Sequence, residues 1–244
     1  VDMIGLMREH GLPLASLETY TPVRNFDFVG ITLPHELCAT NILEFLDLAG
    51  ITLHADERGE DEPLVMGGGP CAYNPEPFAP FFDLIFVGEG EELDVEVALR
   101  HRELKKRGAS RAEILRELSR IEGVYVPSLY DVEEHEIRDE QLAAGMRGYT
   151  TVTPIDAEVP AQVAKRIIRD FDALPALPRQ IVPYCELVHD RLAIEILRGC
   201  NRGCRFCQAG MIYRPVRERK ADTVIAAVMD GLASTGYDEV SLTS

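Results

Sequence analysis

The stretch DFVGITLPHELCATNILEFLDLAG, residues 27–50, decides the fold class. It opens with a continuous apolar segment over residues 27–33 that ends at Pro34, which is typical of a strand buried on both faces. Residues 39–49 follow with apolar side chains at helical spacing, and Gly50 ends the pattern. A buried strand followed directly by a helix is the repeating unit of a parallel α/β sheet.

The same alternation continues on both sides of this stretch. Toward the N-terminus it predicts a helix over residues 3–10 and a short strand over residues 14–17. Toward the C-terminus it predicts two strands and then two helices, over residues 63–66, 84–87, 91–106 and 111–120. We therefore expect a parallel, doubly wound α/β domain over residues 1–120.

The pattern changes at Gly123 and resumes at Arg191. Edge strands are predicted at 124–127 and 149–153, on either side of an acidic segment, and five prolines then interrupt the pattern, so residues 121–188 are interpreted as an irregular linker. The region 189–244 is expected to form one βαβ unit of a second parallel domain. Its predicted elements are a strand at 192–197, a helix at 221–234 and a strand from residue 239.

Composition limits the function classes. The chain has 244 residues, 46% of them hydrophobic, and no apolar segment long enough to cross a bilayer, as expected of a soluble globular protein. The 25 basic and 41 acidic side chains give a net charge of -16, which disfavours nonspecific nucleic-acid binding. No secretory leader opens the sequence, so a cytoplasmic location is expected. The first residue, Val1, and the strand-like end at Ser244 are interpreted as cuts from a longer chain.

Cysteine spacing is the strongest chemical signal. In a reducing compartment, six cysteines indicate metal or redox chemistry rather than disulfides, and Cys200, Cys204 and Cys207 form a C-x3-C-x2-C loop directly after a predicted strand. Three soft thiolates suit a four-iron cluster and leave one iron without a protein ligand. Structural zinc is the alternative, but it usually needs four ligands, and the other nearby donors are Cys185 and His189.

This loop, with Phe206 at its aromatic position, resembles the signature of the radical S-adenosylmethionine (radical SAM) superfamily. The resemblance implies a [4Fe-4S] cluster on the three cysteines and S-adenosylmethionine on the fourth iron, whose reductive cleavage yields a 5'-deoxyadenosyl radical. It also implies that Phe206 lies near the adenine; shielding of the cluster from solvent is the other interpretation. Arginines beside the loop, Arg198, Arg202 and Arg205, are left without a role because exposed arginines are usually solvated.

Two glycine-bearing turns give a second, weaker signal. Residues 66–70 (MGGGP) and 87–91 (VGEGE) follow predicted parallel strands, and ligands of open α/β sheets bind at that edge, where glycines let them approach the backbone. Tight turns are an equally good interpretation of these glycines. The sequence contains neither a G-x-G-x-x-G fingerprint nor a Walker loop, so phosphate binding has no support.

Together with the cysteine loop, the segments REHGLPLASLET, FVGITLPHELCATNILEFLDLAGI and GGGPCAYNPEPFAPFFD resemble an uncharacterised subfamily of radical SAM proteins with a B12-binding domain. The resemblance implies a flavodoxin-like (Rossmann-like) cobalamin domain whose first strand precedes Val1, followed by the start of a radical SAM partial (β/α) barrel that continues past Ser244. The residues that it places at the cobalamin edge are Thr32, Gly67, Gly68, Gly69, Gly88, Glu89 and Gly90.

The predicted function is that of a radical SAM enzyme that uses cobalamin, with methyl transfer to an unactivated carbon as the candidate reaction on an unknown substrate. The resemblance also implies an electron donor such as flavodoxin or ferredoxin, and no membrane partner. The 244-residue chain alone is expected to be inactive, because a barrel site draws residues from many strands.

Two alternatives remain open. A methylthiotransferase acting on RNA or protein usually carries extra cluster cysteines in its first domain, where this chain offers only Cys38 and Cys71. A noncatalytic interaction module with a structural metal is the other. Both of these cysteines are interpreted as structural, and His35 as a helix-start residue rather than a cobalt ligand.

Overall fold

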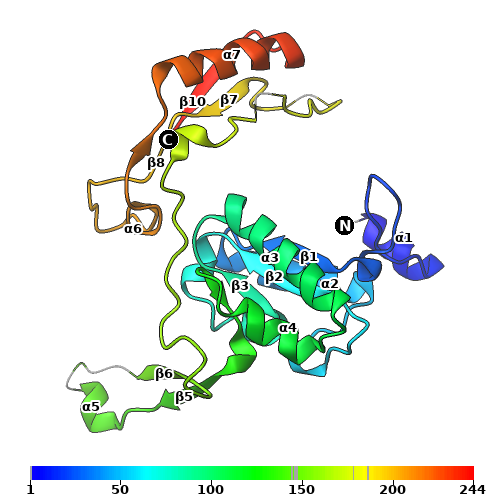
Figure 1. Cartoon of the computed structure of the whole chain (residues 1–244), viewed down its shortest axis with the longest axis vertical. Helices are drawn as coiled ribbons and strands as arrows, with labels where there is room; N and C mark the ends of the chain where they lie inside the picture. Colours follow the sequence, from blue (N-terminus) through cyan, green and yellow to red (C-terminus); the bar gives the residue numbers. More distant parts are fainter. Residues whose placement is uncertain (1, 144, 146–147, 178, 186) are drawn as a thin grey trace. The chain divides into compact units, whose positions relative to one another are not determined.

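The computed structural model describes residues 2–143, 145, 148–177, 179–185 and 187–244. The chain divides into two compact units, Val1–Arg166 and Ile167–Ser244, which are considered separately (Figure 1). Among the helices of the described residues, none has both the length and the apolar character needed to cross a lipid bilayer.

The first unit is built on a four-stranded sheet. Strands β1 (Phe28–Thr32), β2 (Leu64–Gly68) and β3 (Leu84–Phe86) are parallel, and β4 (Val124–Tyr125) pairs with β3 in the antiparallel direction. The strands stand side by side in sequence order. The predicted parallel sheet is therefore confirmed, whereas the reversal of strand order that defines a doubly wound sheet does not occur among the described strands.

The predicted helices of this unit are confirmed. They are α1 (Asp2–His10), α2 (Ala39–Ala49), α3 (Gly90–Lys106) and α4 (Arg111–Leu118). Gly50 ends α2 because it adopts a left-handed conformation, with φ of 67°. Ser110 and Glu113 start α4 with a reciprocal capping box. Short 3-10 turns connect the elements of the chain, at Val23–Asn25, Glu36–Cys38, Ala55–Glu57, Pro70–Tyr73, Ala79–Phe81, Pro127–Leu129 and Phe171–Ala173.

Helices cover both faces of the sheet because buried apolar residues alternate along the strands. Val65 and Ile85 face one layer, where they pack with α2 through Ile42 and Leu46. Their sequence neighbours face the other layer, where they pack with α3 and α4; they are Leu64, Leu84 and Phe86. The unit is thus a mixed α/β fold with a buried, mostly parallel sheet.

Two sequence-based expectations about β1 and its surroundings are wrong. Gly30 and Thr32, which share one face of β1, are exposed, so the strand is not buried on both faces along its whole length. Residues 14–17 form no strand, because their sheet pairing is limited to one isolated bridge, Ala15 with Pro22. In both places the local apolar pattern did not show which other segments would pair with the chain or pack on it.

The acidic segment after the sheet forms a hairpin rather than a loop. Strand β5 (Tyr130–His135) pairs with β6 (Tyr149–Pro154), and α5 (Asp139–Ala143) lies between them. The compact unit reaches Arg166, past the predicted boundary at residue 120, because β4 completes the first sheet and Arg166 bridges to Gly88. Strand β4 lies at the edge of the sheet, as predicted for this segment, and both of its residues are buried.

The second unit contains the predicted βαβ arrangement. Strands β7 (Leu192–Glu195) and β10 (Val240–Thr243) are parallel, and α7 (Ala221–Thr235) packs on them through Ala227 and Val228. The predicted strand over residues 192–197 is interrupted, since after β7 the chain pairs differently: β8 (Leu197–Arg198) joins β9 (Arg217–Glu218). A short helix, α6 (Ala209–Ile212), lies between β8 and β9. This unit begins at Ile167, within the predicted linker.

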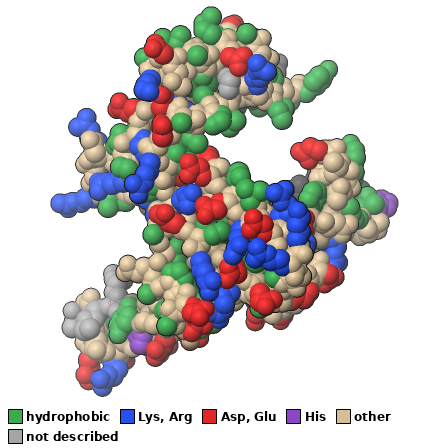
Figure 2. Space-filling model, in the orientation of Figure 1, with side chains coloured by type: hydrophobic (Ala, Val, Ile, Leu, Met, Phe, Trp, Pro, Cys, Tyr) green, Lys and Arg blue, Asp and Glu red, His purple; other side chains and the backbone are tan. Residues whose placement is uncertain are grey.

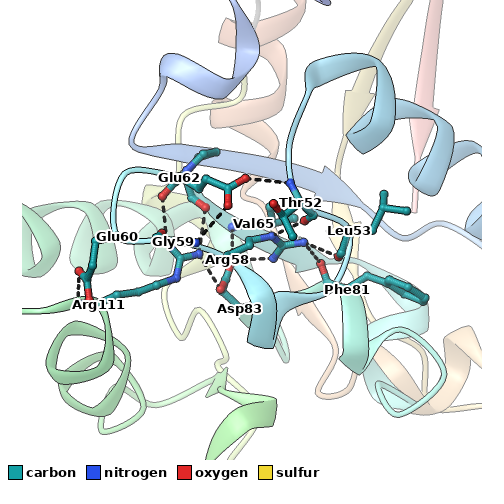
Figure 3. A network of polar contacts seen from close by, with 11 residues as sticks. Thr52, Leu53, Arg58, Gly59, Glu60, Glu62, Val65, Phe81, Asp83 and Arg111 are labelled. Atoms are coloured by element: carbon teal, nitrogen blue, oxygen red, sulfur yellow. Dashed lines mark hydrogen bonds and ion pairs between the residues drawn. The ribbon is translucent and has the colours of Figure 1, made fainter.

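A buried ionic network holds the amino-terminal side of the first sheet (Figure 3). The Asp83 carboxylate accepts hydrogen bonds from Arg58 at 2.8 Å, Arg111 at 2.7 Å and the backbone N–H of Val65 at 2.8 Å. Both arginines also donate to backbone carbonyls, those of Thr52, Leu53 and Phe81 for Arg58 and those of Gly59, Glu62 and Pro63 for Arg111. The two guanidiniums thus fasten the loop over residues 52–63 to the segments that precede β2 and β3.

Candidate functional site: a glycine hollow and a cysteine loop

A hollow of about 290 Å³ opens at the carboxyl ends of β1, β2 and β3. It gathers six of the seven residues predicted for this edge, namely Thr32, Gly67, Gly68, Gly69, Gly88 and Gly90. The other residues that line it are Gly30, Ile31, Met66, Phe86 and Asp94. The edge of the sheet predicted from the glycine turns is therefore a concave surface.

Bare backbone forms the floor of this hollow. Gly68 lies opposite Thr32 in the β1–β2 register, and Gly30 lies opposite Met66. A Cβ on Gly68 would meet nothing closer than the Phe86 Cβ at 3.7 Å, and a Cβ on Gly30 nothing closer than the Met66 Cε at 3.9 Å. The space above these two glycines is thus a cradle that side chains would fill, and a flat ligand could approach the sheet closely there.

Gly67 and Gly69 have packing explanations as well. A Cβ on Gly67 would lie 3.0 Å from the Phe82 ring and 3.1 Å from the Leu33 Cδ1, so this glycine allows close packing on the α2 side of the sheet. Gly69 has φ of 109° and turns the chain sharply after β2. In this turn, the interpretation as a ligand-binding edge therefore applies to Gly68, whereas a tight turn explains Gly69 and close packing explains Gly67.

The backbone of Arg166 covers the sheet edge just after the carboxyl end of β3. The Arg166 N–H donates to the carbonyl of Val87 at 2.9 Å, and the Glu89 N–H donates to the carbonyl of Arg166 at 3.1 Å. A Cβ on Gly88 would lie 2.2 Å from the Arg166 carbonyl oxygen, which makes glycine necessary at this position. Glu89 precedes α3 and does not line the hollow. The open surface is therefore centred on β1 and β2.

Asp94 is a lining residue that sequence reasoning missed. Gly90 is the first residue of α3, and a Cβ built on it would lie 3.4 Å from the Asp94 Oδ2. Desolvation by the surrounding protein, and next the charge of Glu91, raise the pKa of Asp94. The sequence signal that could have identified Asp94 is its position four residues after Gly90, because residues i and i+4 share one face of a helix.

The lone residues singled out near this edge lie outside the hollow. His35 is exposed at the start of the 3-10 turn Glu36–Cys38, and its carbonyl accepts a hydrogen bond from the Cys38 thiol at 2.8 Å. Cys71 is buried in the core, where desolvation raises the pKa of its thiol. No histidine is among the described residues that line the hollow.

The cysteine loop connects β8 to α6 in the second unit. Cys200 and Cys207 are half-buried, Cys204 is exposed, and Phe206 is 92% exposed. A turn brings the Cys207 N–H to the carbonyl of Cys204 at 3.1 Å. Within the described residues, no three His, Cys, Asp or Glu side chains gather closely enough to hold a metal ion. The donor set thus fits a cluster by its chemistry, while the three thiols do not converge in this conformation, and Cys185 with His189 does not complete a zinc site either.

Gly199 sets the start of the loop and was not singled out from sequence. Its φ is 94°, and a Cβ would lie 2.5 Å from the carbonyl oxygens of both Tyr213 and Pro215. The chain after α6 therefore passes directly against the backbone before Cys200. The left-handed conformation and the close approach both require glycine.

Replacing Gly199 by Ala is expected to displace the loop, because the backbone of residues 213–215 cannot yield to a methyl group as a flexible side chain could. We expect iron incorporation into the full-length protein to fall by about an order of magnitude or more, as strain in a ligand-bearing loop lowers metal affinity. Gly236→Ala is the matched control, since Gly236 also has a positive φ, of 78°, but nothing lies within 4 Å of its Cβ position. Equal iron content in the two variants would contradict the role of Gly199.

Arginines hold the frame of the loop. Arg198 makes two hydrogen bonds of 2.9 Å to Glu195, and its guanidinium lies over the buried Phe171 ring, which Arg219 also contacts. Arg217 donates to the carbonyl of Ile168 at 2.8 Å. Arg198, left without a role from sequence alone, thus has a structural one; Arg202 and Arg205 are exposed.

Positive charge is concentrated around the loop. Residues 198–220 carry seven Lys or Arg and one Glu, a local net charge of +6 in a chain of net charge -16. Lys and Arg side chains gather on the part of the surface where α6 lies (Figure 2). Positive charge concentrated in this way attracts anionic groups to this part of the surface.

Comparisons with known proteins identify a family and two proteins that this chain resembles. A family model described as "Radical SAM proteins, N-terminal" matches residues 1–127, which contain the sheet and the hollow but not the cysteine loop. An uncharacterised protein of Methanocaldococcus jannaschii is 28% identical over 228 residues, which are 93% of this chain and 40% of that protein. The radical S-adenosylmethionine methyltransferase TsrM of Kitasatospora setae, solved with tryptophan and a SAM analogue, is 15% identical, with a TM-score of 0.46 over 99% of this chain and 39% of TsrM. The chain thus spans about two fifths of each of these two proteins.

Proposed function

Because the chain belongs to the radical SAM proteins through their N-terminal region, we propose that it forms the front part of an enzyme that holds a [4Fe-4S] cluster on Cys200, Cys204 and Cys207. The observation that carries this proposal is that the three cysteines lie on one loop, which begins after Gly199. This loop belongs to the same unit as the βαβ arrangement of β7, α7 and β10. Three thiolates on a single loop leave one iron for an exogenous chelating ligand.

When bound and reduced by an external electron donor, a cluster of this kind would supply the electron that cleaves the sulfonium of S-adenosylmethionine, and this cleavage would start hydrogen abstraction from a substrate. The chain's own contribution is placement and charge. Gly199 fixes where the loop begins, and the local charge of +6 offsets the negative charge of a thiolate-ligated cluster. Phe206, at 92% exposure, presents an aromatic face on which an adenine ring could stack.

The proposal includes cobalamin at the glycine hollow of the first unit. Bare backbone at Gly30 and Gly68 supports it, because a wide and flat group needs a surface without side chains. Asp94 brings a carboxyl group to the lining of the hollow, where it can form a hydrogen bond with a bound group. No histidine is proposed as a cobalt ligand, since none lines the described hollow. Methyl transfer to carbon, with electrons from a small redox protein such as flavodoxin or ferredoxin, is the reaction we propose.

The test of the proposed function uses the full-length protein, purified without oxygen and reconstituted with iron and sulfide. We expect about four irons and four sulfides per chain, an absorbance shoulder near 400 nm, and 5'-deoxyadenosine on addition of S-adenosylmethionine and a strong reductant. Stoichiometric zinc with no cleavage product would favour a noncatalytic interaction module instead.

Gly68→Val is expected to abolish corrinoid retention while leaving iron content unchanged. The valine side chain enters the hollow from the strand, and β-branched residues are well tolerated in strands, so the fold should survive. Retention is measured by absorbance after reconstitution with hydroxocobalamin and desalting.

Gly5→Val is a suitable control, because it adds the same side chain at a position with nothing within 4 Å and outside the hollow. If wild-type protein retains no corrinoid, or if the Gly68 variant retains as much as wild type, the hollow is not the cobalamin site.

A further inference from the structure

A groove of about 830 Å³ lies between the β5–β6 hairpin and the loops on the α2 side of the sheet. In Figure 1 the hairpin projects from the body of the first unit. Apolar side chains line the groove on the side of the loops, and they are Ala55, Pro77, Ala79, Pro80, Phe82 and Pro127. The groove belongs entirely to the first unit and is separate from the glycine hollow.

The hairpin register determines which residues face the groove. Val132 pairs with Val152, and Glu134 pairs with Thr150. These four residues share one face of the hairpin, because alternate residues of a strand point to the same side, and all four line the groove. Val132 is 47% exposed and Val152 is 37% exposed, so the groove presents an uncovered apolar pair.

The hairpin is attached to the rest of the unit at its base. The Tyr130 hydroxyl donates to the carbonyl of Pro160 at 2.7 Å, and the Ile155 N–H donates to the carbonyl of Leu129 at 3.0 Å. A two-stranded ribbon is only marginally stable in water unless something packs on its apolar face. A segment placed in the groove would cover Val132 and Val152 and supply that packing.

Charge indicates what kind of segment fits. The groove lining holds three carboxylates, those of Asp56, Glu76 and Glu134, and no lysine or arginine among its described residues. Residues 130–154 carry six acidic side chains and two arginines. Residues 1–166 hold 31 acidic and 15 basic side chains, so the net charge of -16 resides in this unit. Pairing of this groove with the same groove of a second copy would bring two acidic surfaces together, which repulsion disfavours.

We propose that this groove docks a polypeptide segment of a partner protein in which lysines or arginines alternate with small apolar residues. The apolar side chains cover the Val132–Val152 pair, and the basic side chains meet Glu134 and Asp56 at the rim. An extended segment suits this arrangement, because it can follow the groove with its small apolar side chains on the valine pair, while its long basic side chains reach the carboxylates at the rim. This docking is independent of the cluster and of cobalamin.

The test measures fluorescence anisotropy of a labelled peptide of alternating lysine and valine with the full-length protein. A peptide with glutamate in place of lysine is expected not to bind. Glu134→Lys should weaken binding of the lysine peptide about tenfold or more, because it reverses a charge that faces the groove. Glu133→Lys is the matched control: it makes the same change one residue away, on the opposite face of β5, and should weaken binding no more than about twofold.

Other outcomes overturn the proposal. Equal weakening by the two variants would show nonspecific attraction to an acidic protein, and absence of binding by the lysine peptide would remove the docking site. A photo-crosslinking amino acid at position 132 identifies other occupants of the groove. A crosslink within one chain would mean that the protein's own segment fills it, and a crosslinked dimer, supported by sedimentation, would assign it to a second copy.

Discussion

Replacing Cys200, Cys204 or Cys207 by Ala, one at a time in the full-length protein, is expected to abolish both iron retention and cleavage of S-adenosylmethionine. Each cysteine supplies one of three protein ligands on the same loop, and two thiolates cannot hold a four-iron cluster while one iron is left open for the chelating ligand. Iron and sulfide content, together with chromatographic detection of 5'-deoxyadenosine, measure the effect.

The remaining cysteines provide the control for this experiment. Cys38, Cys71 and Cys185 lie away from the loop in sequence, and in the described residues none belongs to a metal-binding group. Their Ala variants should keep the cluster. Full cleavage activity in any one of the three loop variants would refute the assignment, and loss of iron in a control variant would extend the ligand set.

Asp83→Asn is expected to destabilise the first unit by about 3–5 kcal/mol, the usual cost of removing one partner from a buried ion pair. The Asp83 and Arg58 side chains are 1% and 0% exposed, and Asp83 is also the ion-pair partner of Arg111. Without the Asp83 charge, the guanidiniums of Arg58 and Arg111 lose their shared carboxylate partner. Desolvation already lowers the pKa of Arg58, which shows that its charged form is costly in this region. Because a whole domain is stable by only about 5–15 kcal/mol, this change removes a large share of its stability.

Urea denaturation followed by circular dichroism measures this loss. Asp27→Asn is the matched control, since it removes the same charge from an exposed pair with Lys105 and should cost no more than about 1 kcal/mol. Similar unfolding midpoints for the two variants would mean that the buried network contributes little beyond an ordinary surface pair.

Local sequence pattern predicted most elements of the fold correctly. The helix at residues 39–49 and the strand at residues 64–66 were predictable because their apolar periodicity and terminal glycines are properties of neighbouring residues. The strand expected at residues 14–17 failed for the converse reason. A strand needs a partner, and the pairing of that segment stops at one bridge.

The hairpin shows a different limit of the pattern. Its first strand lies within an acidic segment, which favours a loop, yet β5 pairs along its whole length with the threonine-rich β6. Cross-strand pairing between residues about twenty apart overrode composition there. The groove proposed as a docking surface depends on that register and could not be inferred without it.

The amino-acid sequence by itself determined most of the order of strands and helices, the spacing of the three cysteines and the glycines at the sheet edge, because each of these is a relation between near neighbours. The tertiary structure alone decided that Gly68 faces an open hollow whereas Gly67 packs on Phe82 and Gly88 against Arg166. It likewise joined Arg58, Asp83 and Arg111 in one network. These contacts link residues 15 to 78 positions apart, and the physical reason for the difference is that such contacts form only when strand pairing and layer packing bring distant segments together.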